Sequence, residues 1–128
     1  MENIYDNDND NVKELIKDNF DISSKKLKLK KEFTKDLNGL LIIYAPWCTH
    51  CVLSKDMWEN LANMFTYKFN IYAYNTYNYD DKNHDLLLDL NIKYYPSYKF
   101  IKKNGEIVDY KGGKTEDDFL KFIMKNKS

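Results

Sequence analysis

Residues 44–51 read Tyr44-Ala45-Pro46-Trp47-Cys48-Thr49-His50-Cys51, and they hold both cysteines of the chain, three residues apart. The longest apolar run of the sequence, residues 40–44, leads into this stretch and predicts a strand buried on both faces. Pro46 ends that strand, and a helical pattern begins at about Thr49. Two cysteines at the junction of a buried strand and a helix favour redox chemistry.

The two cysteines are expected to have different roles. Cys48 lies at or next to a helix N-terminus, where unpaired amide groups and the helix dipole favour a thiolate. Cys51 lies one turn further along the same face, within reach of a disulfide. In thiol–disulfide exchange one thiol attacks as the thiolate and a second resolves the mixed disulfide. Position therefore assigns attack to Cys48 and resolution to Cys51.

Neighbours of the two cysteines are further candidates. An imidazolium at His50 stabilises a nearby thiolate and therefore the reduced pair, which favours a potential of about −180 mV over one of about −270 mV. Thr49 lies between the cysteines and is a modulating candidate. Trp47 has two interpretations, as a cover of the thiol pair that contacts substrate or as a core anchor. His84, in a loop rich in Asn and Asp, is interpreted as a surface residue.

Other uses of the cysteine pair stay open. The pair is also compatible with half of a zinc site, but four-coordinate zinc needs two more ligands, and only His50 and His84 are available besides carboxylates. A structural remnant, or a redox sensor without turnover, fits the spacing as well. We expect a redox-active Cys48–Cys51 disulfide, with no metal and no organic cofactor.

Length and composition predict one compact domain. The chain has 128 residues, of which 43% are hydrophobic, enough for a single core. Twenty acidic and twenty basic residues balance, which argues against nucleic acid or an anionic membrane as partner. The sequence shows no signal-peptide pattern and no apolar run long enough to span a bilayer. These features predict a cytoplasmic protein, or a virion protein if a virus encodes it.

The remaining pattern predicts a mixed sheet with helices on both faces. In chain order we expect a disordered acidic, Asn-rich tail at 1–11, a helix at 12–20, a strand or loose hairpin at 22–29, a helix at 49–65, a strand at 69–74, a short helix at 86–90, an antiparallel hairpin of 98–101 and 106–110 around Asn104-Gly105, and a terminal helix capped by Thr115. Residues 12–128 then form a single domain.

The ordered set of motifs resembles the thioredoxin superfamily. It consists of Ala45 to Cys51, then Tyr95-Pro96-Ser97, then Lys103-Asn104-Gly105 and Gly112-Gly113. Within that superfamily the chain is most similar to the catalytic domains of protein disulfide isomerases, whose active site also has Pro before Trp and His before the second Cys. The resemblance covers roughly residues 27–123. It implies an α/β thioredoxin fold with a central mixed sheet, and thiol–disulfide exchange with protein substrates.

The resemblance also implies roles for residues far from the cysteines. Pro96 is expected to be cis and to lie against the pair, while Tyr95 offers its backbone to an extended substrate. Gly112 either allows close approach of a backbone or forms a turn. Lys114 aligns with an arginine that tunes the resolving thiol in isomerases, and it either keeps a weaker version of that role or is a solvated base.

Three positions depart from the family pattern. A buried acid normally relays protons to the resolving thiol, and this chain has Ile42 there, so we expect slow release of the mixed disulfide. Val52 replaces a frequent lysine after the second cysteine. Asp56 replaces a common proline, which predicts a helix without its usual kink.

These inferences predict an oxidase or isomerase of protein disulfides. The alternatives are a thioredoxin-like disulfide reductase and a redox-sensing peptide-binding module with little turnover. The expected partners are protein or peptide thiols and disulfides, together with a redox partner such as glutathione, a flavoenzyme reductase or an oxidase.

Overall fold

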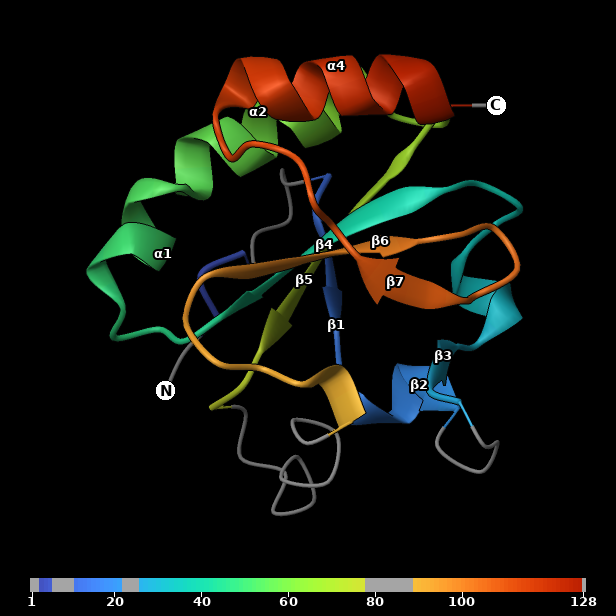
Figure 1. Cartoon of the computed structure of the whole chain (residues 1–128), viewed down its shortest axis with the longest axis horizontal. Coiled ribbons are helices and arrows are strands. Elements are labelled where there is room, and N and C mark those ends of the chain that lie inside the picture. Colours follow the sequence, from blue (N-terminus) through green and yellow to red (C-terminus); the bar gives the residue numbers. More distant parts are fainter. Residues whose placement is uncertain (1–2, 6–10, 22–25, 78–88, 128) are drawn as a thin grey trace.

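The computed structural model describes residues 3–5, 11–21, 26–77 and 89–127. Its main sheet has five strands in the order β1-β5-β4-β6-β7. They span Lys13–Leu15 (β1), Gly39–Tyr44 (β4), Asn70–Asn75 (β5), Ser97–Ile101 (β6) and Ile107–Asp109 (β7). β5 is parallel to both β1 and β4, whereas β6 is antiparallel to β4 and β7. The predicted mixed sheet is therefore confirmed, and Figure 1 shows it across the middle of the molecule.

β4 is the central strand, as the apolar run at 40–44 predicts. All of its residues are buried, because it has a strand on either side and side chains cover both of its faces. Alternate residues face different clusters: Leu40, Ile42 and Tyr44 belong to one, and Leu41 and Ile43 to the other.

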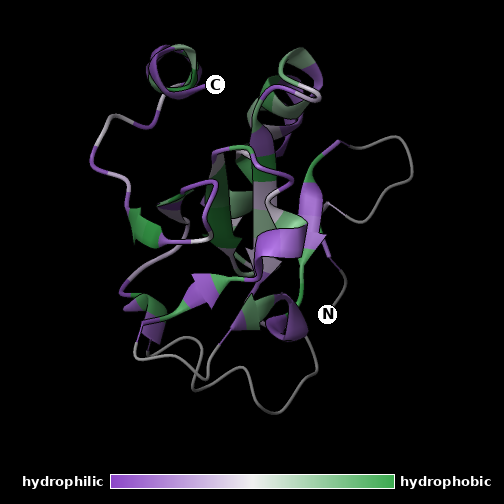
Figure 2. Cartoon of the chain, turned by 90° about the vertical axis from the view of Figure 1, so that its right-hand side faces the viewer, coloured by the Kyte–Doolittle hydropathy of each residue, from purple (hydrophilic) through white to green (hydrophobic). Residues whose placement is uncertain are grey.

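Helices cover one face of this sheet. They are α1 (Thr49–Leu53), α2 (Lys55–Met64) and α4 (Glu116–Asn126). Figures 1 and 2 place α2 and α4 on the same side of the sheet. Between them and the sheet lie Trp58 and Leu61 of α2 and Phe119 and Ile123 of α4, all fully buried. None of the helices in the described ranges is long and apolar enough to cross a membrane.

The opposite face packs against short elements. They are the 3₁₀ turns η1 (Lys17–Asn19) and η2 (Lys31–Phe33) and the antiparallel pair β2 (Phe20–Asp21) and β3 (Lys28–Leu29). The β2–β3 pair fits the loose hairpin expected near residues 22–29. Most of the short helix expected at 86–90 lies outside the described residues.

The helix expected at 12–20 is wrong. This segment forms β1, η1 and β2 instead. β1 pairs with β5, so its backbone hydrogen bonds are supplied by a strand far along the chain. Ile16, which the helical spacing placed on the buried face, is 45% exposed. Long-range strand pairing overrides the local periodicity here.

The described part of the expected tail packs against the domain. Tyr5 is only 2% exposed, and its ring meets that of Tyr44 edge-on at 5.5 Å. The Ile4 amide donates to the Tyr44 hydroxyl at 3.1 Å. The Asn3 side chain accepts from Asn75 at 2.8 Å, so the Tyr5 ring and two hydrogen bonds together hold residues 3–5 on the core.

The single helix expected at 49–65 is interrupted at Ser54. The Ser54 hydroxyl donates to the His50 carbonyl at 2.8 Å, and the Ser54 amide is shared by the His50 and Cys51 carbonyls at 3.1 and 3.2 Å. A serine that bonds back to the preceding turn bends a helix. The expectation of an unkinked helix, drawn from Asp56 in place of proline, is therefore wrong, because Ser54 provides the interruption.

The C-terminal elements follow local signals in the sequence. Gly105 has φ of 94°, and a Cβ there would lie 2.2 Å from the Leu29 carbonyl oxygen, so the turn between β6 and β7 requires glycine. Thr115 caps α4, because its hydroxyl accepts the Asp118 amide at 3.1 Å while the Asp118 carboxylate accepts the Thr115 amide at 3.2 Å. The predicted hairpin and capped helix are both confirmed.

Candidate active site

The two cysteines lie where the chain passes from β4 into α1. Cys48 is the N-cap residue of α1, and its sulfur accepts the Cys51 amide at 3.4 Å. The Cys48 amide donates to the Ala45 carbonyl at 3.0 Å, which closes a tight turn after the strand. Cys48 thus has the helix-start position that the sequence predicts, and an amide points at its sulfur.

The surroundings of the two thiols differ. Cys48 is 8% exposed, whereas Cys51 has no exposed surface. Burial raises the pKa of the Cys51 thiol to about 12, and the adjacent Cys48 thiol adds to this effect. Cys51 is therefore protonated near neutral pH, and Cys48 is the thiol that solvent and reactants can reach.

We expect iodoacetamide to alkylate Cys48 long before Cys51 in the reduced protein. The raised pKa of the Cys51 thiol leaves little of it ionised at pH 8, and its burial keeps the reagent away. Peptide mass spectrometry after a short pulse of reagent locates the label. A urea-denatured sample, in which both thiols react, is the control, and equal labelling of both cysteines in the folded protein would contradict this assignment.

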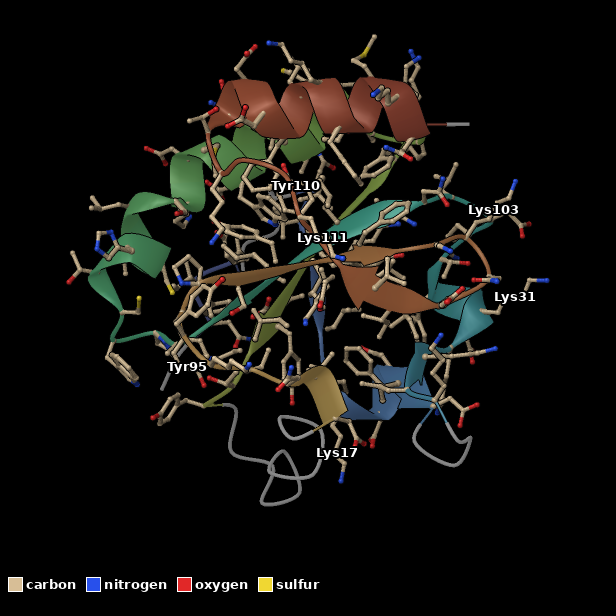
Figure 3. All side chains as sticks on the ribbon, viewed as in Figure 1. Lys17, Lys31, Tyr95, Lys103, Tyr110 and Lys111 are labelled. Carbon is tan, nitrogen blue, oxygen red and sulfur yellow. The ribbon has the colours of Figure 1, made fainter. Side chains whose placement is uncertain are left out.

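A proline loop faces Cys48. The Tyr95–Pro96 peptide bond is cis, and the Cys48 thiol lies 3.8 Å from the Tyr95 carbonyl oxygen. Trp47 is 53% exposed, and its ring meets those of Tyr95 and Tyr77 edge-on at 5.9 and 5.7 Å. Trp47 is thus a surface residue beside the pair and does not anchor the core. Figure 3 shows Tyr95 before β6, toward the side of the molecule where α1 lies.

A cleft of about 420 Å³ opens next to the pair. It is lined by His50, Leu53, Ser54, Met57, Tyr94, Tyr95, Pro96, Tyr98 and Lys114. The Lys114 amine lies 4.9 Å from the centre of the Tyr94 ring and 3.4 Å from its hydroxyl. The structure therefore brings Lys114, Pro96 and His50 to one cleft, although they are far apart in the sequence.

The other expected site residues lie at the edges of this arrangement. Thr49 is the exposed first residue of α1. Gly112 lies against Tyr110, whose hydroxyl would be 2.5 Å from a Cβ at that position. His84 is outside the described residues. Within the described ranges, no three His, Cys, Asp or Glu side chains gather in a group that could hold a metal ion.

Sequence reasoning did not single out Tyr98 as a site residue. Tyr98 is 7% exposed, and it is the cross-strand neighbour of Ile42 in the β4–β6 register. Burial raises the pKa of Tyr98 to about 12, while its hydrogen bond to the Ser54 side chain opposes the shift. Pairing the strand at 40–44 with the strand after Pro96 would have placed Tyr98 beside Ile42 and so identified it.

Comparison with known families and curated proteins gives a consistent result. The family model described as Thioredoxin matches residues 11–125. Protein disulfide isomerase-like 2-2 of Oryza sativa subsp. japonica is 35% identical over 107 residues, which cover 83% of this chain and 26% of that protein. Protein disulfide-isomerase of Datisca glomerata is 31% identical over 127 residues, which cover 98% of this chain and 23% of that protein. The chain thus spans about a quarter of the length of these relatives.

Solved structures show the same fold. Thioredoxin f from spinach chloroplast aligns with a TM-score of 0.67 and 24% identity, covering 98% of both chains. The J-Trx1 fragment of ERdj5 aligns with a TM-score of 0.68 and 22% identity, covering 95% of this chain and 54% of that one. At these identities the likeness concerns the fold alone.

Proposed function

Because this chain belongs to the thioredoxin family, we propose that it is a thiol–disulfide oxidoreductase that exchanges disulfides with protein substrates through Cys48 and Cys51. The observation that carries the proposal is the difference between the two thiols. The Cys48 thiol lies 3.8 Å from the carbonyl oxygen of Tyr95, a residue that lines the cleft, and the Cys51 amide points at the Cys48 sulfur, while Cys51 is fully buried. In this proposal Cys48 attacks the substrate, and Cys51 resolves the mixed disulfide.

The proposed reaction takes two steps. The Cys48 thiolate attacks one sulfur of a substrate disulfide, and the other substrate sulfur leaves with the bonding electron pair and takes up a proton. Cys51 then loses its proton and attacks the Cys48 sulfur, which forms the Cys48–Cys51 disulfide and frees the second substrate thiolate. The substrate gains two electrons and the cysteine pair loses two. Run in reverse, the same steps oxidise a substrate dithiol.

The cleft supports protein or peptide substrates. The Tyr95 carbonyl and the cis Pro96 face Cys48, and the exposed Trp47 and Leu53 add apolar surface on the same side. An extended segment that uses its backbone to bind beside Tyr95 needs no particular side chains. We therefore propose weak sequence selectivity, with glutathione or a flavoenzyme as the redox partner.

We expect the Cys48–Cys51 pair to have a potential of about −180 mV, in the range of a disulfide oxidase or isomerase. His50 is exposed in α1, and its imidazolium form stabilises a thiolate at Cys48. The measurement is equilibration in graded glutathione buffers followed by alkylation and mass spectrometry. His50→Leu should move the potential to a more negative value, by about 30 mV for each tenfold change in the equilibrium.

Other results of that titration lead to different conclusions. A potential of about −270 mV would favour a reductase that a flavoenzyme recycles. Failure of the pair to form a disulfide would contradict the proposed exchange. A redox-sensing peptide-binding module with little turnover is the second candidate, and the apolar Ile42, buried at the centre of β4, favours it because it cannot assist Cys51.

A further inference from the structure

The second step of the proposed reaction requires a proton to leave a fully buried thiol. Cys51 has no exposed surface and lies in a cluster with Ile42 and Ala73 of the two central strands. Neither of these side chains accepts a proton. The thiol nevertheless has to ionise, because only the thiolate attacks the Cys48 sulfur. A polar group inside this cluster is therefore needed to connect Cys51 with solvent.

The Tyr98 hydroxyl is such a group. Tyr98 is the cross-strand partner of Ile42 and belongs to the same buried cluster as Cys51 and Cys48. The two thiols act electrostatically on the Tyr98 hydroxyl and, after burial, add to the upward shift of its pKa. The phenol is consequently neutral at working pH and keeps the proton that it can donate toward a thiolate.

Tyr98 also reaches the cleft. Its side chain lines the cleft together with those of Ser54 and His50, and it shares a hydrogen bond with Ser54. The Ser54 hydroxyl is held in turn by the His50 carbonyl at 2.8 Å. The Tyr98 side chain thus belongs to the buried cluster that contains Cys51 and also borders the cleft.

We propose that the Tyr98 hydroxyl carries the proton between Cys51 and the cleft. The apolar side chain of Ile42 cannot carry this proton. The inference rests on the proposed exchange reaction. As Cys51 attacks, its proton moves to the Tyr98 oxygen, while the phenol proton passes to water in the cleft. The phenol is neutral before and after, and no electrons move through it. In the reverse direction the proton returns to the departing Cys51 thiolate.

Tyr98→Phe tests the relay, because it removes the hydroxyl and keeps the ring that packs on Trp58 and Phe119 at 5.4 and 4.8 Å. The reduced protein is mixed with a disulfide-containing peptide, and formation and release of the Cys48 adduct are followed separately by acid quenching and mass spectrometry from pH 6 to 10. Release should fall about tenfold to a hundredfold near pH 7, and formation should not change. The deficit should shrink toward pH 10, where hydroxide removes the Cys51 proton.

Tyr110→Phe is the matched control. Tyr110 belongs to the same aromatic cluster, but its hydroxyl donates to the Gly113 carbonyl. Figure 3 shows Tyr110 on the side of the sheet where α4 lies. A second variant, Tyr98→Phe combined with Ile42→Glu, returns a carboxylate to the cluster and should restore release with a different pH profile.

The outcomes separate the relay from the exchange reaction itself. If Tyr98→Phe releases substrate as fast as the unmodified protein, or if Tyr110→Phe slows release equally, the relay is wrong and the exchange reaction stands. If the unmodified protein never forms a Cys48 adduct, the proposed function itself fails. Slow release confined to Tyr98→Phe and relieved by Ile42→Glu supports the relay.

Discussion

Replacement of Cys51 by Ala is expected to stop turnover and to leave protein substrates attached to Cys48 through a mixed disulfide. Without the buried thiol, nothing in the pair attacks the Cys48 sulfur from behind, so the first step still occurs and the second does not. The expected rate of disulfide exchange with a protein substrate is that of the buffer alone. Non-reducing electrophoresis should show adducts that disappear on addition of dithiothreitol.

Cys48→Ala is the companion variant. It should be equally inactive but form no adducts, because the remaining thiol is fully buried and protonated. Adducts through Cys51 would reverse the assigned roles. A passive peptide-binding module would behave differently, since both variants would hold the partner without a covalent bond and in either thiol state.

Trp58→Ala is expected to lower the free energy of unfolding by about 3–5 kcal/mol. Trp58 has no exposed surface, and its ring lies 5.2 Å from that of Phe119 on α4. Its indole N–H donates to the Tyr72 carbonyl at 2.9 Å, so truncation also removes a buried hydrogen bond. The total stability of a domain is about 5–15 kcal/mol, so the variant is expected to be close to unfolding at physiological temperature.

Urea unfolding followed by far-UV circular dichroism measures this loss. Trp47→Ala is the control, because Trp47 is 53% exposed and its removal should change stability by less than about 1 kcal/mol. Equal effects of the two substitutions would contradict the assignment of Trp58 to the core. Trp58→Phe should lie between them, since it keeps a ring but loses the hydrogen bond.

Local signals predicted much of the fold. The run at 40–44 is apolar at every position, which is typical of a strand covered on both faces, and it forms β4. The turn at Asn104-Gly105 and the helix start at Thr115 depend on residues that are close in sequence. Both could therefore be predicted from the local sequence alone. The conformation of residues 12–20 was not predicted correctly, because it depends on pairing with β5, a strand more than fifty residues later.

The same distinction applies to the candidate site. The placement of Cys48 and Cys51 follows from one strand and one helix turn that are contiguous in sequence. The neighbourhood of Tyr98 and Ile42 depends on the register between β4 and β6, and that of Lys114 and His50 on how a later loop returns to α1. Tertiary pairing sets these relations, and no periodicity within either segment encodes them.

The outer strands of the sheet affect how readily this protein associates with unfolded chains. Its two outermost strands, β1 and β7, are each three residues long. An outer strand offers unpaired amides and carbonyls on which an unfolded chain can assemble, and short, charged strands limit that template. Lys13 and Glu14 on β1 and Asp109 on β7 add charge at these borders. The short, charged outer strands therefore limit the assembly of other unfolded chains along the two flanks of this domain.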